Sequence, residues 1–544
     1  MISGTLKTKR LAALGALLVL GTSMLLSGCG GGDKKASSGD GGKSKDKILT
    51  VGYTNAPSGV NPLATPDVAA HLISRYMYDT LLGQPDTNKF TPHLALSIDT
   101  KDKQTYTIKL NPKAQWSDGK PITADDVVFT LNLAANPNVI SSLGRYMNFL
   151  QGLSTGGKLK AAGTIPGLKK IDDHTVEFKT KKPIDPNIVK AGLGFNVNIV
   201  PKHVFEKIDP KNIPNAKEVN NPTVFSGPYK FVKYVTNDHM ELAANDKYVL
   251  GAPKIKRLFL SFASDTNLVV NLKAGKVQIN AISGVGKIPV KEIDGLKADK
   301  KLEVKEIPAD SSQFLMPNCS KFNVHFRRAL SYAINKDQLV NQLFKGHADV
   351  TPTLYTRPSS VFDKDLKGLE YSPEKAKAEL AQSGFDTSKE LTLLVPIGNS
   401  LREQSAEPIQ QNLKAIGLNV KISKVDFPTL LANARKGTFD MLLIGLSQPP
   451  DPDYSTYFAP GSLSNYSLAN DEKLMEMFEE GIQKTDFADR KKIYTEIQKY
   501  LNDNQFQIVL YNPKNTSVKS KNLVGGVTPY WDGSLDDIYK WELK

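Results

Sequence analysis

The apolar residues of this chain change repeatedly between an alternating pattern and a helical one. In Ile48–Thr54 apolar and polar residues alternate, which is the pattern of a half-buried strand. Val68–Leu82 carries apolar residues at helical spacing. Phe326, Leu330 and Ile334 recur at intervals of four, which predicts another helix packed by one face. Repeated helix and strand units of this kind predict an α/β fold.

Residues at the ends of these patterns indicate where helices begin and stop. Thr123 is a suitable N-cap, and Asp125 and Asp126 in the following turn favour a helix start. Gly417 falls between a helical stretch from Gln410 and the strand-like residues that end at Ile422, so we expect it to end that helix.

The stretch from Phe439 to Phe458 combines a buried strand with a rigid polar loop. Phe439–Leu446 is apolar apart from Asp440, as in a strand buried on both faces. Prolines at positions 449, 450 and 452 cannot donate to a sheet, so the chain must leave the strand as a stiff loop. That loop carries Asp451, Asp453, Tyr454 and Tyr457. Polar groups on a stiff loop at a strand end predict a ligand site.

The N-terminal residues predict export and attachment to a membrane. Lys7, Lys9 and Arg10 precede the uncharged run Leu11–Leu26, which is typical of a signal peptide. The run ends in Leu-Ser-Gly-Cys29, which resembles the lipobox of bacterial lipoproteins. We therefore expect residues 1–28 to be a signal peptide and Cys29 to be lipidated. The alternative is an ordinary signal peptide with a chance cysteine.

A flexible tether follows, and composition then limits what the body can be. Residues 29–47 are rich in Gly, Ser and Lys and lack large apolar side chains, so a reach of roughly 23 Å is expected. With Cys29 lipidated, Cys319 has no disulfide partner. At 544 residues the chain is long enough for several domains. Its net charge of +14 is spread among acids, which favours a solvated surface near an anionic envelope over nucleic-acid binding.

A series of passages resembles the family 5 extracellular solute-binding proteins of bacterial ABC importers, which include oligopeptide- and dipeptide-binding proteins. The passages occur in the family's order from Ile48 to Lys544: YDTLLG at 78–83, QWSDGKPITADDVVFTL at 115–131, SGPY at 226–229, HFRRALSYAINKDQLVNQLFKGHA at 325–348, YSPEKAKAELAQSGF at 371–385, IQQNLKAIGLNVKI at 409–422 and FDMLLIGLSQPPDPDYS at 439–455.

The resemblance implies a two-lobed periplasmic-binding-protein-like α/β fold with an extra subdomain and a ligand cleft between the lobes. Two crossovers would join the lobes, near Val304–Gln313 and Gln507–Asn515. Lobe I would comprise residues 48–83, 189–308 and 512–544, the extra subdomain residues 84–188, and lobe II residues 309–511.

The resemblance also implies a site that pairs with a peptide backbone. Candidate ligand-binding residues are Tyr53, Thr54, Asn55, Asn318, Arg402, Leu446, Ser447, Gln448, Asp451 and Asp453. For Arg402, a plain surface position is the alternative. Family members commonly carry Gly-Trp and then an aspartate that binds the peptide's amino group, and here Gly445-Leu446 lacks both. Asp451 or Asp453 could replace that aspartate, or the ligand could be held without an amine contact, and both alternatives stay open.

No enzymatic constellation is present in the sequence. The glycine-rich loop Gly152–Lys158 is followed by Leu159 instead of the Ser or Thr of a phosphate-binding loop, and the histidines show no ligand spacing. We therefore expect a monomeric, membrane-anchored extracytoplasmic receptor without cofactor, which captures peptides of oligopeptide length for an ABC permease with a separate ATPase. The alternatives are a receptor of the same fold for a nickel chelate, sugar or opine-like compound, and an anchored envelope enzyme or adhesin.

Overall fold

The computed structural model describes residues 47–65, 67–449, 451–526 and 535–544. They belong to one compact unit, Asp46–Lys544. The predicted signal peptide, Cys29 and nearly all of the tether lie outside the described residues, as does Pro450. Within the described ranges, no helix is long and apolar enough to cross a membrane.

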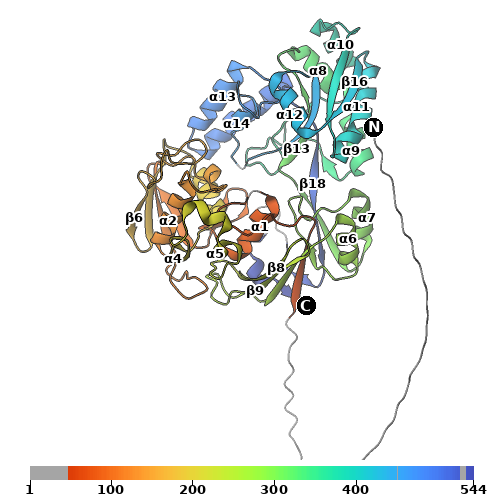
Figure 1. Ribbon diagram of the computed structural model, residues 1–544. Helices are drawn as coiled ribbons and strands as arrows, with labels where there is room; N and C mark the ends of the chain where they lie inside the picture. The colour runs from red at the N-terminus through yellow and green to blue at the C-terminus, as the bar shows by residue number, and fades with distance from the viewer. Residues whose placement is uncertain (1–46, 66, 450, 527–534) are drawn as a thin grey trace, which may run out of the picture. The chain divides into compact units, whose positions relative to one another are not determined.

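One long strand runs through a large mixed sheet and joins its two halves. The first residues of β18 (Ile508–Ser520) pair antiparallel with β13 (Ser311–Pro317), and its later residues pair antiparallel with β12 (Leu302–Pro308). Only Ala309 and Asp310 separate β12 from β13. The chain therefore passes between the halves twice, once through these two residues and once along β18, which is the arrangement of a two-lobed fold (Figure 1).

Lobe I surrounds the first strand of the body. β1 (Ile48–Tyr53) is parallel to β10 (Arg257–Phe262) and to β11 (Ile279–Asn280). The sheet continues antiparallel through β9 (His239–Ala244) and β8 (Tyr229–Val235). The helices of this part are α1 (Val68–Met77), α6 (Asp265–Lys273) and α7 (Val290–Ala298). The predicted strand at 48–54 and helix at 68–82 are thus confirmed, with slightly shorter bounds.

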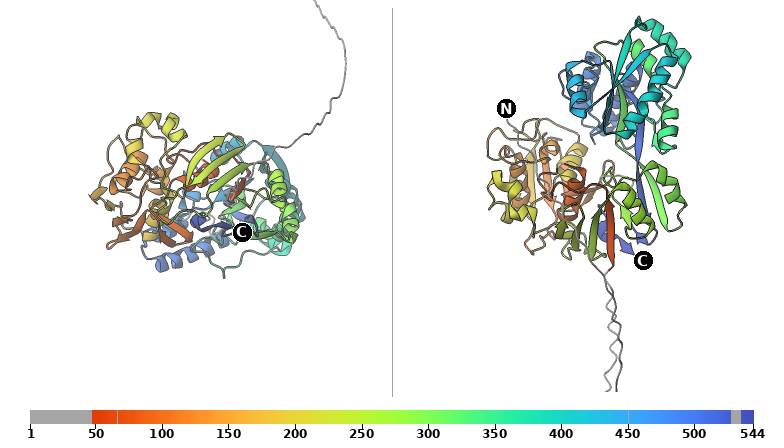
Figure 2. Two further views of the ribbon diagram at one scale, coloured as in Figure 1. Left: turned by 90° about the horizontal axis from the view of Figure 1, so that it is seen from below. Right: turned by 45° about the vertical axis from the view of Figure 1, so that its right-hand side comes forward.

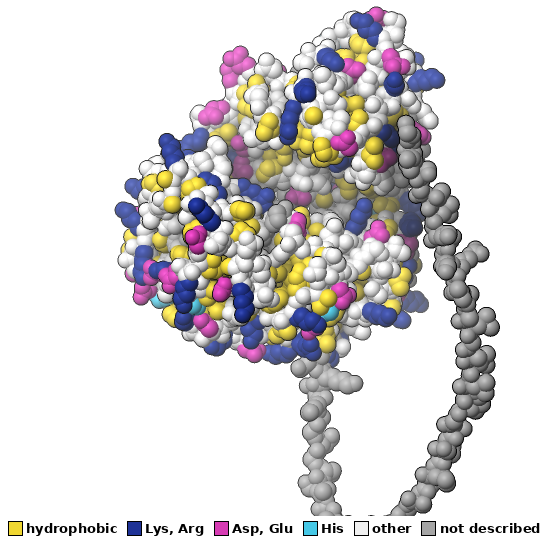
Figure 3. All heavy atoms as spheres, viewed as in Figure 1, with side chains coloured by type: hydrophobic (Ala, Val, Ile, Leu, Met, Phe, Trp, Pro, Cys, Tyr) yellow, Lys and Arg dark blue, Asp and Glu magenta, His cyan; other side chains and the backbone are white. Residues whose placement is uncertain are grey.

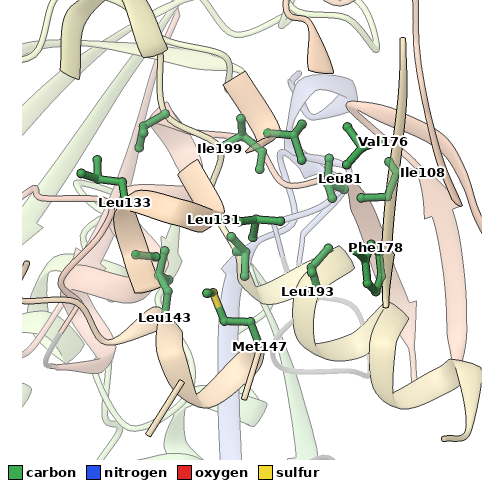
Figure 4. Packing of buried hydrophobic residues seen from close by; sticks show 14 of the residues in the cluster. Leu81, Ile108, Leu131, Leu133, Leu143, Met147, Val176, Phe178, Leu193 and Ile199 are labelled. Carbon is green, nitrogen blue, oxygen red and sulfur yellow. The ribbon is translucent and has the colours of Figure 1, made fainter. Parts of the chain in front are cut away.

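The extra subdomain is built on its own antiparallel sheet. Its strands in spatial order are β4 (Ala95–Thr100), β5 (Thr105–Leu110), β7 (Thr175–Lys179) and β6 (Lys169–Asp172). α2 (Ala124–Ala135) starts at the predicted N-cap Thr123, where Asp126 completes a capping box. Leu131, Ile108 and Phe178 meet in a buried core that draws residues from Leu63 to Val219 (Figure 4).

Lobe II encloses its strands between two groups of helices (Figure 2). Along β17 (Met441–Ser447), Met441 and Leu443 belong to one buried cluster, and Leu442 and Ile444 to another. This confirms the prediction of a strand buried on both faces. Its sheet neighbours are β13 and β15 (Glu390–Pro396), followed by β16 (Asn419–Val425).

The helices of lobe II divide between these two clusters. The helices whose residues join the cluster of Met441 are α8 (Val324–Ala333), α9 (Lys336–Phe344), α10 (Pro373–Ser383) and α11 (Ser400–Ala415); those that join the other are α12 (Phe427–Lys436), α13 (Glu472–Gln483) and α14 (Phe487–Asn504). The helix predicted around Phe326 is confirmed as α8. Gly417 follows α11 with a φ of 94°, a left-handed conformation that favours glycine.

Shorter elements complete the chain. They are β2 (Leu82–Asp86), β3 (Lys89–Pro92), η1 (Leu143–Tyr146), α3 (Pro186–Val189), η2 (Lys190–Phe195), α4 (Lys202–Phe205), η3 (Pro210–Asn215), α5 (Lys217–Asn220), β14 (Ala348–Asp349), η4 (Ser455–Tyr457), β19 (Leu523–Val524), η5 (Ile538–Lys540) and β20 (Glu542–Leu543). The residue ranges given above for the lobes and the subdomain stay a prediction.

Candidate functional site

Two adjoining cavities lie where the extra subdomain, lobe I and lobe II meet. Their volumes are about 540 and 590 Å³, each within the range of ligand pockets. They share Arg145, Tyr146, Asn196, Asp310, Gln448 and Pro449, so together they form one continuous cleft. The space-filling view shows the surface hollowed between the upper and lower parts of the molecule (Figure 3). We call the first the subdomain cavity and the second the crossover cavity.

Several buried polar atoms of the cleft have no hydrogen-bond partner. In the described part of the chain, nine buried side-chain N or O atoms lack a partner, and five of them belong to residues that line these two cavities. The five are Gln84 Oε1, Asn196 Oδ1, Ser283 Oγ, Thr356 Oγ1 and Gln448 Oε1. Each unpaired buried group costs about 1–3 kcal/mol, so these five atoms are available for hydrogen bonds to a molecule in the cleft. Three of the five are amide oxygens, which only accept.

Gln448 shows how the fold leaves one acceptor unused. It directly follows β17, and its backbone N–H donates to the carbonyl oxygen of Asp310 at 2.7 Å. Its side-chain Nε2 donates to Ser312 Oγ at 3.2 Å. These two bonds fix the side chain, which is only 4% exposed, with Oε1 unpaired. The strand end and the crossover therefore position Gln448 together.

Asp451 is held by a buried arginine. Arg490 of α14 forms an ion pair with Asp451 at 3.0 Å and another with Asp185 of the extra subdomain at 3.3 Å. Burial opposes the charge on Arg490, but Asp451 and its other partners raise its pKa above the ordinary value. Asp451 also accepts the backbone N–H of Asp453 at 2.9 Å. This three-residue cluster joins the polar loop of lobe II to the extra subdomain.

The rest of the loop is also fixed by its own side chains. Burial, and then the charge of Asp451, raises the pKa of Asp453, whose Oδ1 accepts the backbone N–H of Ser455. The hydroxyl of Tyr457 donates to the carbonyl of Ser447 at 2.8 Å. Tyr454 stacks on a neighbouring tyrosine with 4.6 Å between ring centroids. The stiff loop predicted from its prolines is thus stiffened further by aromatic contacts.

Two cations of the cleft have no acidic partner. Arg145, which lines both cavities, is exposed and lies over the ring of Tyr146 at 4.7 Å. Lys287 lines the crossover cavity and is also exposed. Neither forms an ion pair with any described residue, whereas Lys514 in the same cavity pairs with Asp349 at 3.4 Å. The cleft therefore offers positive charge to a ligand carboxylate.

The structure brings four of the predicted site residues to the cleft. Ser447 lines the crossover cavity, Gln448 lines both cavities, and Asp451 and Asp453 line the subdomain cavity. Ser447 is the last residue of β17, and the other three belong to the loop that follows it.

The other six predicted residues do not line either cavity. The hydroxyl of Tyr53 lies 3.3 Å from that of Tyr76 in the lobe I core, and Thr54 Oγ1 and Asn55 Oδ1 hydrogen bond to each other at 3.1 Å. Asn318 is fully buried, and its Nδ2 donates to the carbonyls of Gly437 and Phe439. These contacts give Tyr53 and Asn318 structural roles.

Leu446 is part of strand β17, and Arg402 of α11 contacts the neighbouring strand β13. Arg402 Nε donates to Gln313 Oε1 at 2.8 Å, and burial lowers the pKa of the guanidinium. A Cβ at Gly445 would lie within 2.5 Å of both side chains, so the absence of a side chain at this position makes room for them. Leu446 pairs with Ser312 across β17 and β13.

Sequence reasoning missed most of the cleft wall. Gln84, Arg145, Asn196, Ser283 and Thr356 come from a hairpin, a short 3₁₀ helix and three loops spread over more than two hundred residues. They share no motif or spacing, and no local signal distinguishes them from other polar surface residues. Asp310 was within a predicted crossover, which was the one available signal.

The other chemical candidates have structural explanations. Lys158 of the glycine-rich loop donates to the carbonyls of Ala134, Asn136 and Val139, so it satisfies the end of α2. Burial raises the pKa of the Cys319 thiol to about 11. Among the residues described, no cluster of three or more His, Cys, Asp or Glu side chains has the arrangement of a metal site.

The chain belongs to the bacterial extracellular solute-binding proteins, family 5, whose model matches residues 89–467. This confirms the resemblance inferred from the sequence and the two-lobed α/β fold. The family consists of extracytoplasmic solute-binding proteins.

Two of the similar proteins are named as oligopeptide-binding proteins. The chain is 27% identical to the oligopeptide-binding protein AppA of Bacillus subtilis over 98% of both chains. It is 28% identical to the periplasmic oligopeptide-binding protein OppA of Escherichia coli, over 86% of this chain and 87% of OppA. The structure of the Bacillus subtilis AppA in complex with a nonapeptide superposes with a TM-score of 0.71 at 25% identity, covering 92% of this chain and 99% of that one.

The same fold also occurs in proteins with other ligands. NikZ from Campylobacter jejuni in complex with Ni(L-His) has a TM-score of 0.70 at 23% identity, covering 91% of this chain and 99% of that one. At this level of identity the likeness concerns the fold alone.

Proposed function

We propose that this protein is a lipid-anchored extracytoplasmic receptor that captures oligopeptides and delivers them to an ABC permease driven by a separate ATPase. It is a monomer that is anchored to the membrane through a lipid on Cys29. It needs no cofactor and catalyses no reaction. Family membership supports solute capture, and the oligopeptide-binding relatives support peptides as the solute.

The set of unpaired acceptors in the cleft carries this proposal. A peptide backbone presents N–H groups at regular intervals, and Gln84, Asn196 and Gln448 each offer a buried amide oxygen to them. Arg145 and Lys287 supply positive charge for the terminal carboxylate. A receptor that binds main-chain groups in this way accepts many side chains, which suits a nutrient importer.

The ion pair of Asp451 supports the alternative in which the ligand is held without an amine contact. Asp451 already accepts two hydrogen bonds from Arg490 and one from the backbone N–H of Asp453, so we infer that it does not also bind the ligand's amine. The pKa of Asp453 is raised by burial, which disfavours its charged form as well. We therefore infer that main-chain hydrogen bonds hold the peptide and that its N-terminus contributes little.

Binding measurements test both parts. The purified protein is analysed by mass spectrometry for co-purified ligand, and the peptide found is titrated by calorimetry in free and N-acetylated forms. We expect a peptide whose affinity falls less than tenfold on acetylation. A co-purified compound that is not a peptide contradicts the peptide assignment, and a hundredfold loss on acetylation contradicts the inferred binding mode.

The two unpaired cations favour one second candidate, a non-peptide solute with carboxylate groups. Arg145 and Lys287 would bind its carboxylates, and the amide acceptors would bind its hydroxyl or amine groups. The same mass-spectrometric experiment separates this candidate from the peptide receptor.

The anchor has its own test. Wild-type protein expressed in a lipoprotein-processing bacterium should fractionate with membranes and carry a fatty acyl label, and Cys29→Ser should remove both properties. Cys319→Ser is the matched control and should leave fractionation unchanged. Membrane fractionation of Cys29→Ser at the wild-type level would contradict lipidation at this position.

A further inference from the structure

A cluster of lysines surrounds a shallow hollow of about 710 Å³ on lobe I. Its members come from the start of β1, the end of α6, the turn before β12, the end of β18 and the last residue of the chain: Lys47, Lys273, Lys300, Lys301, Lys521 and Lys544. All six are exposed, and no Asp or Glu lines the hollow. We call these residues the basic patch.

Most of this positive charge is not neutralised within the protein. Lys273 pairs with Glu292 at 3.0 Å, and Lys47 Nζ donates to the carbonyl of Leu543. The other four lysines form no ion pair with a described residue. Of the acidic residues beside the patch, Glu542 pairs with Lys254, whereas Asp299 accepts the backbone N–H of Lys301 and keeps its negative charge. The patch is therefore a concentrated positive surface in a protein that elsewhere pairs many of its charges.

The patch lies at the end of lobe I that is opposite the crossovers. β12 begins at the patch with Leu302 and ends at the crossover with Pro308, and β18 runs the other way to Ser520. Six residues of strand separate the two ends by roughly 20 Å. Lys and Arg side chains also gather along the lower edge of the molecule in Figure 3. The patch is thus well separated from the ligand cleft.

The patch is also the place where the chain enters the body. Lys47 is a member of it, and the tether that begins at Cys29 directly precedes Lys47 in the sequence. A lipid on Cys29 would keep this end of lobe I within the reach of the tether, roughly 23 Å. The basic patch therefore lies within reach of any surface to which the tether is anchored.

We propose that the basic patch docks lobe I onto the anionic phospholipid surface of the membrane that holds the anchor, a proposal that rests on the proposed lipidation of Cys29. Exposed lysines without partners suit a diffuse layer of lipid phosphates, because each adds attraction without needing a fixed geometry. The lipid anchor would hold lobe I near the membrane, and the basic patch would add an electrostatic attraction to the same surface.

Vesicle binding by the unlipidated body tests the proposal. Residues 46–544 form a compact unit by themselves and contain the whole patch. This form is mixed with vesicles of phosphatidylcholine, with or without phosphatidylglycerol, and sedimented at low and at physiological salt. We expect binding to the anionic vesicles only, weakening as salt rises. The triple variant Lys300→Gln, Lys301→Gln and Lys521→Gln should lower the partition coefficient at least tenfold.

A second triple variant separates position from net charge. Lys377, Lys389 and Lys421 of lobe II are exposed and form no ion pair with a described residue, so their replacement by Gln removes the same charge elsewhere. This control should bind vesicles as the wild type does, and both triple variants should bind the co-purified ligand normally. Equal loss in both variants, or equal binding to neutral vesicles, would overturn the proposal. So would release of the wild type by millimolar inorganic phosphate, which would indicate a site for a small anion. Because this form lacks Cys29, its result is independent of the fractionation test of the anchor.

Discussion

The loops that follow β1 and β17 look alike in the sequence, and the fold uses them differently. Each follows a buried strand and carries polar residues. After β1, the backbone N–H of Thr54 donates to Val285 O, and Thr54 Oγ1 accepts the N–H of Lys287. After β17, Gln448 is bonded to the crossover residue Asp310 and keeps an unpaired acceptor in the cleft. The polar groups after β1 form hydrogen bonds within lobe I, whereas those after β17 include an unpaired acceptor that lines the cleft.

The difference follows from the neighbours of each strand. β1 lies between β10 and β11, and the residues after β11 fold back onto its end. β17 lies beside β13, whose first residue follows the crossover, so the end of β17 faces the junction of the lobes. A polar strand end is therefore a ligand site only where the tertiary fold leaves it uncovered.

The largest effect should come from the ion cluster that holds the β17 loop. Arg490→Met leaves Asp185, which is 3% exposed, without its charged partner, and we expect a loss of about 3–5 kcal/mol in unfolding free energy. Lys492→Met is the control, since its pair with Asp489 is exposed and should contribute below about 1 kcal/mol. Urea denaturation measures both, and a similar change in the two variants would contradict the structural role of the cluster.

The next effect separates the two loops by ligand affinity. Gln448→Ala removes an acceptor in the cleft, so affinity for the co-purified ligand should fall about tenfold to a hundredfold. Asn55→Ala, outside both cavities, should change it less than twofold. Calorimetry measures both, and circular dichroism verifies folding. An equal loss of ligand affinity in Asn55→Ala and Gln448→Ala would contradict the difference between the two loops.

A substitution at the end of β1 should lower the stability of the protein without changing its ligand affinity. Tyr53→Phe deletes one hydroxyl of the buried pair with Tyr76 and should cost about 1 kcal/mol while leaving ligand affinity unchanged. Thermal unfolding and calorimetry on the same sample provide the two values. A clear loss of affinity would place Tyr53 in the binding site.

The smallest expected effect concerns the buried charged residues that hold Gln84, which lines the subdomain cavity. Gln84 N–H donates to Asp536, which belongs to a buried charged group with Arg75, Asp79 and His93. Burial alone would lower the pKa of His93, but Asp79, and then Asp536, raise it above 6.5 against the opposing charge of Arg75. A raised folded pKa stabilises the protein fully below about pH 6.5, and this contribution is lost as pH rises through the folded value.

Thermal unfolding between pH 6 and 8 tests this sign. The wild type should unfold at a higher temperature than His93→Gln, and this difference in unfolding temperature should shrink as pH rises. An advantage that grows with pH would mean that His93 is neutral when folded. His71→Gln is a suitable control, because its substitution leaves the Asp79–His93 pair intact.

Local patterns predicted much of the fold. The alternation around Val51 and the spacing of Phe326, Leu330 and Ile334 identified their elements, and Thr123 and Gly417 marked two helix ends. These features depend on neighbours a few residues away, which the sequence displays directly. The β17 loop was also predicted as part of the site, because its prolines exclude it from the sheet.

The sequence by itself thus determined the family, the two-lobed α/β fold and the position of one cleft loop. Only the tertiary structure decided that Asp451 pairs with Arg490 and that Gln84, Asn196 and Thr356 line the cleft with unpaired polar atoms. The physical reason is the range of the interactions. Helix and strand formation depends on residues close in sequence, whereas ion pairs and unsatisfied acceptors depend on which distant segments the folded chain brings together.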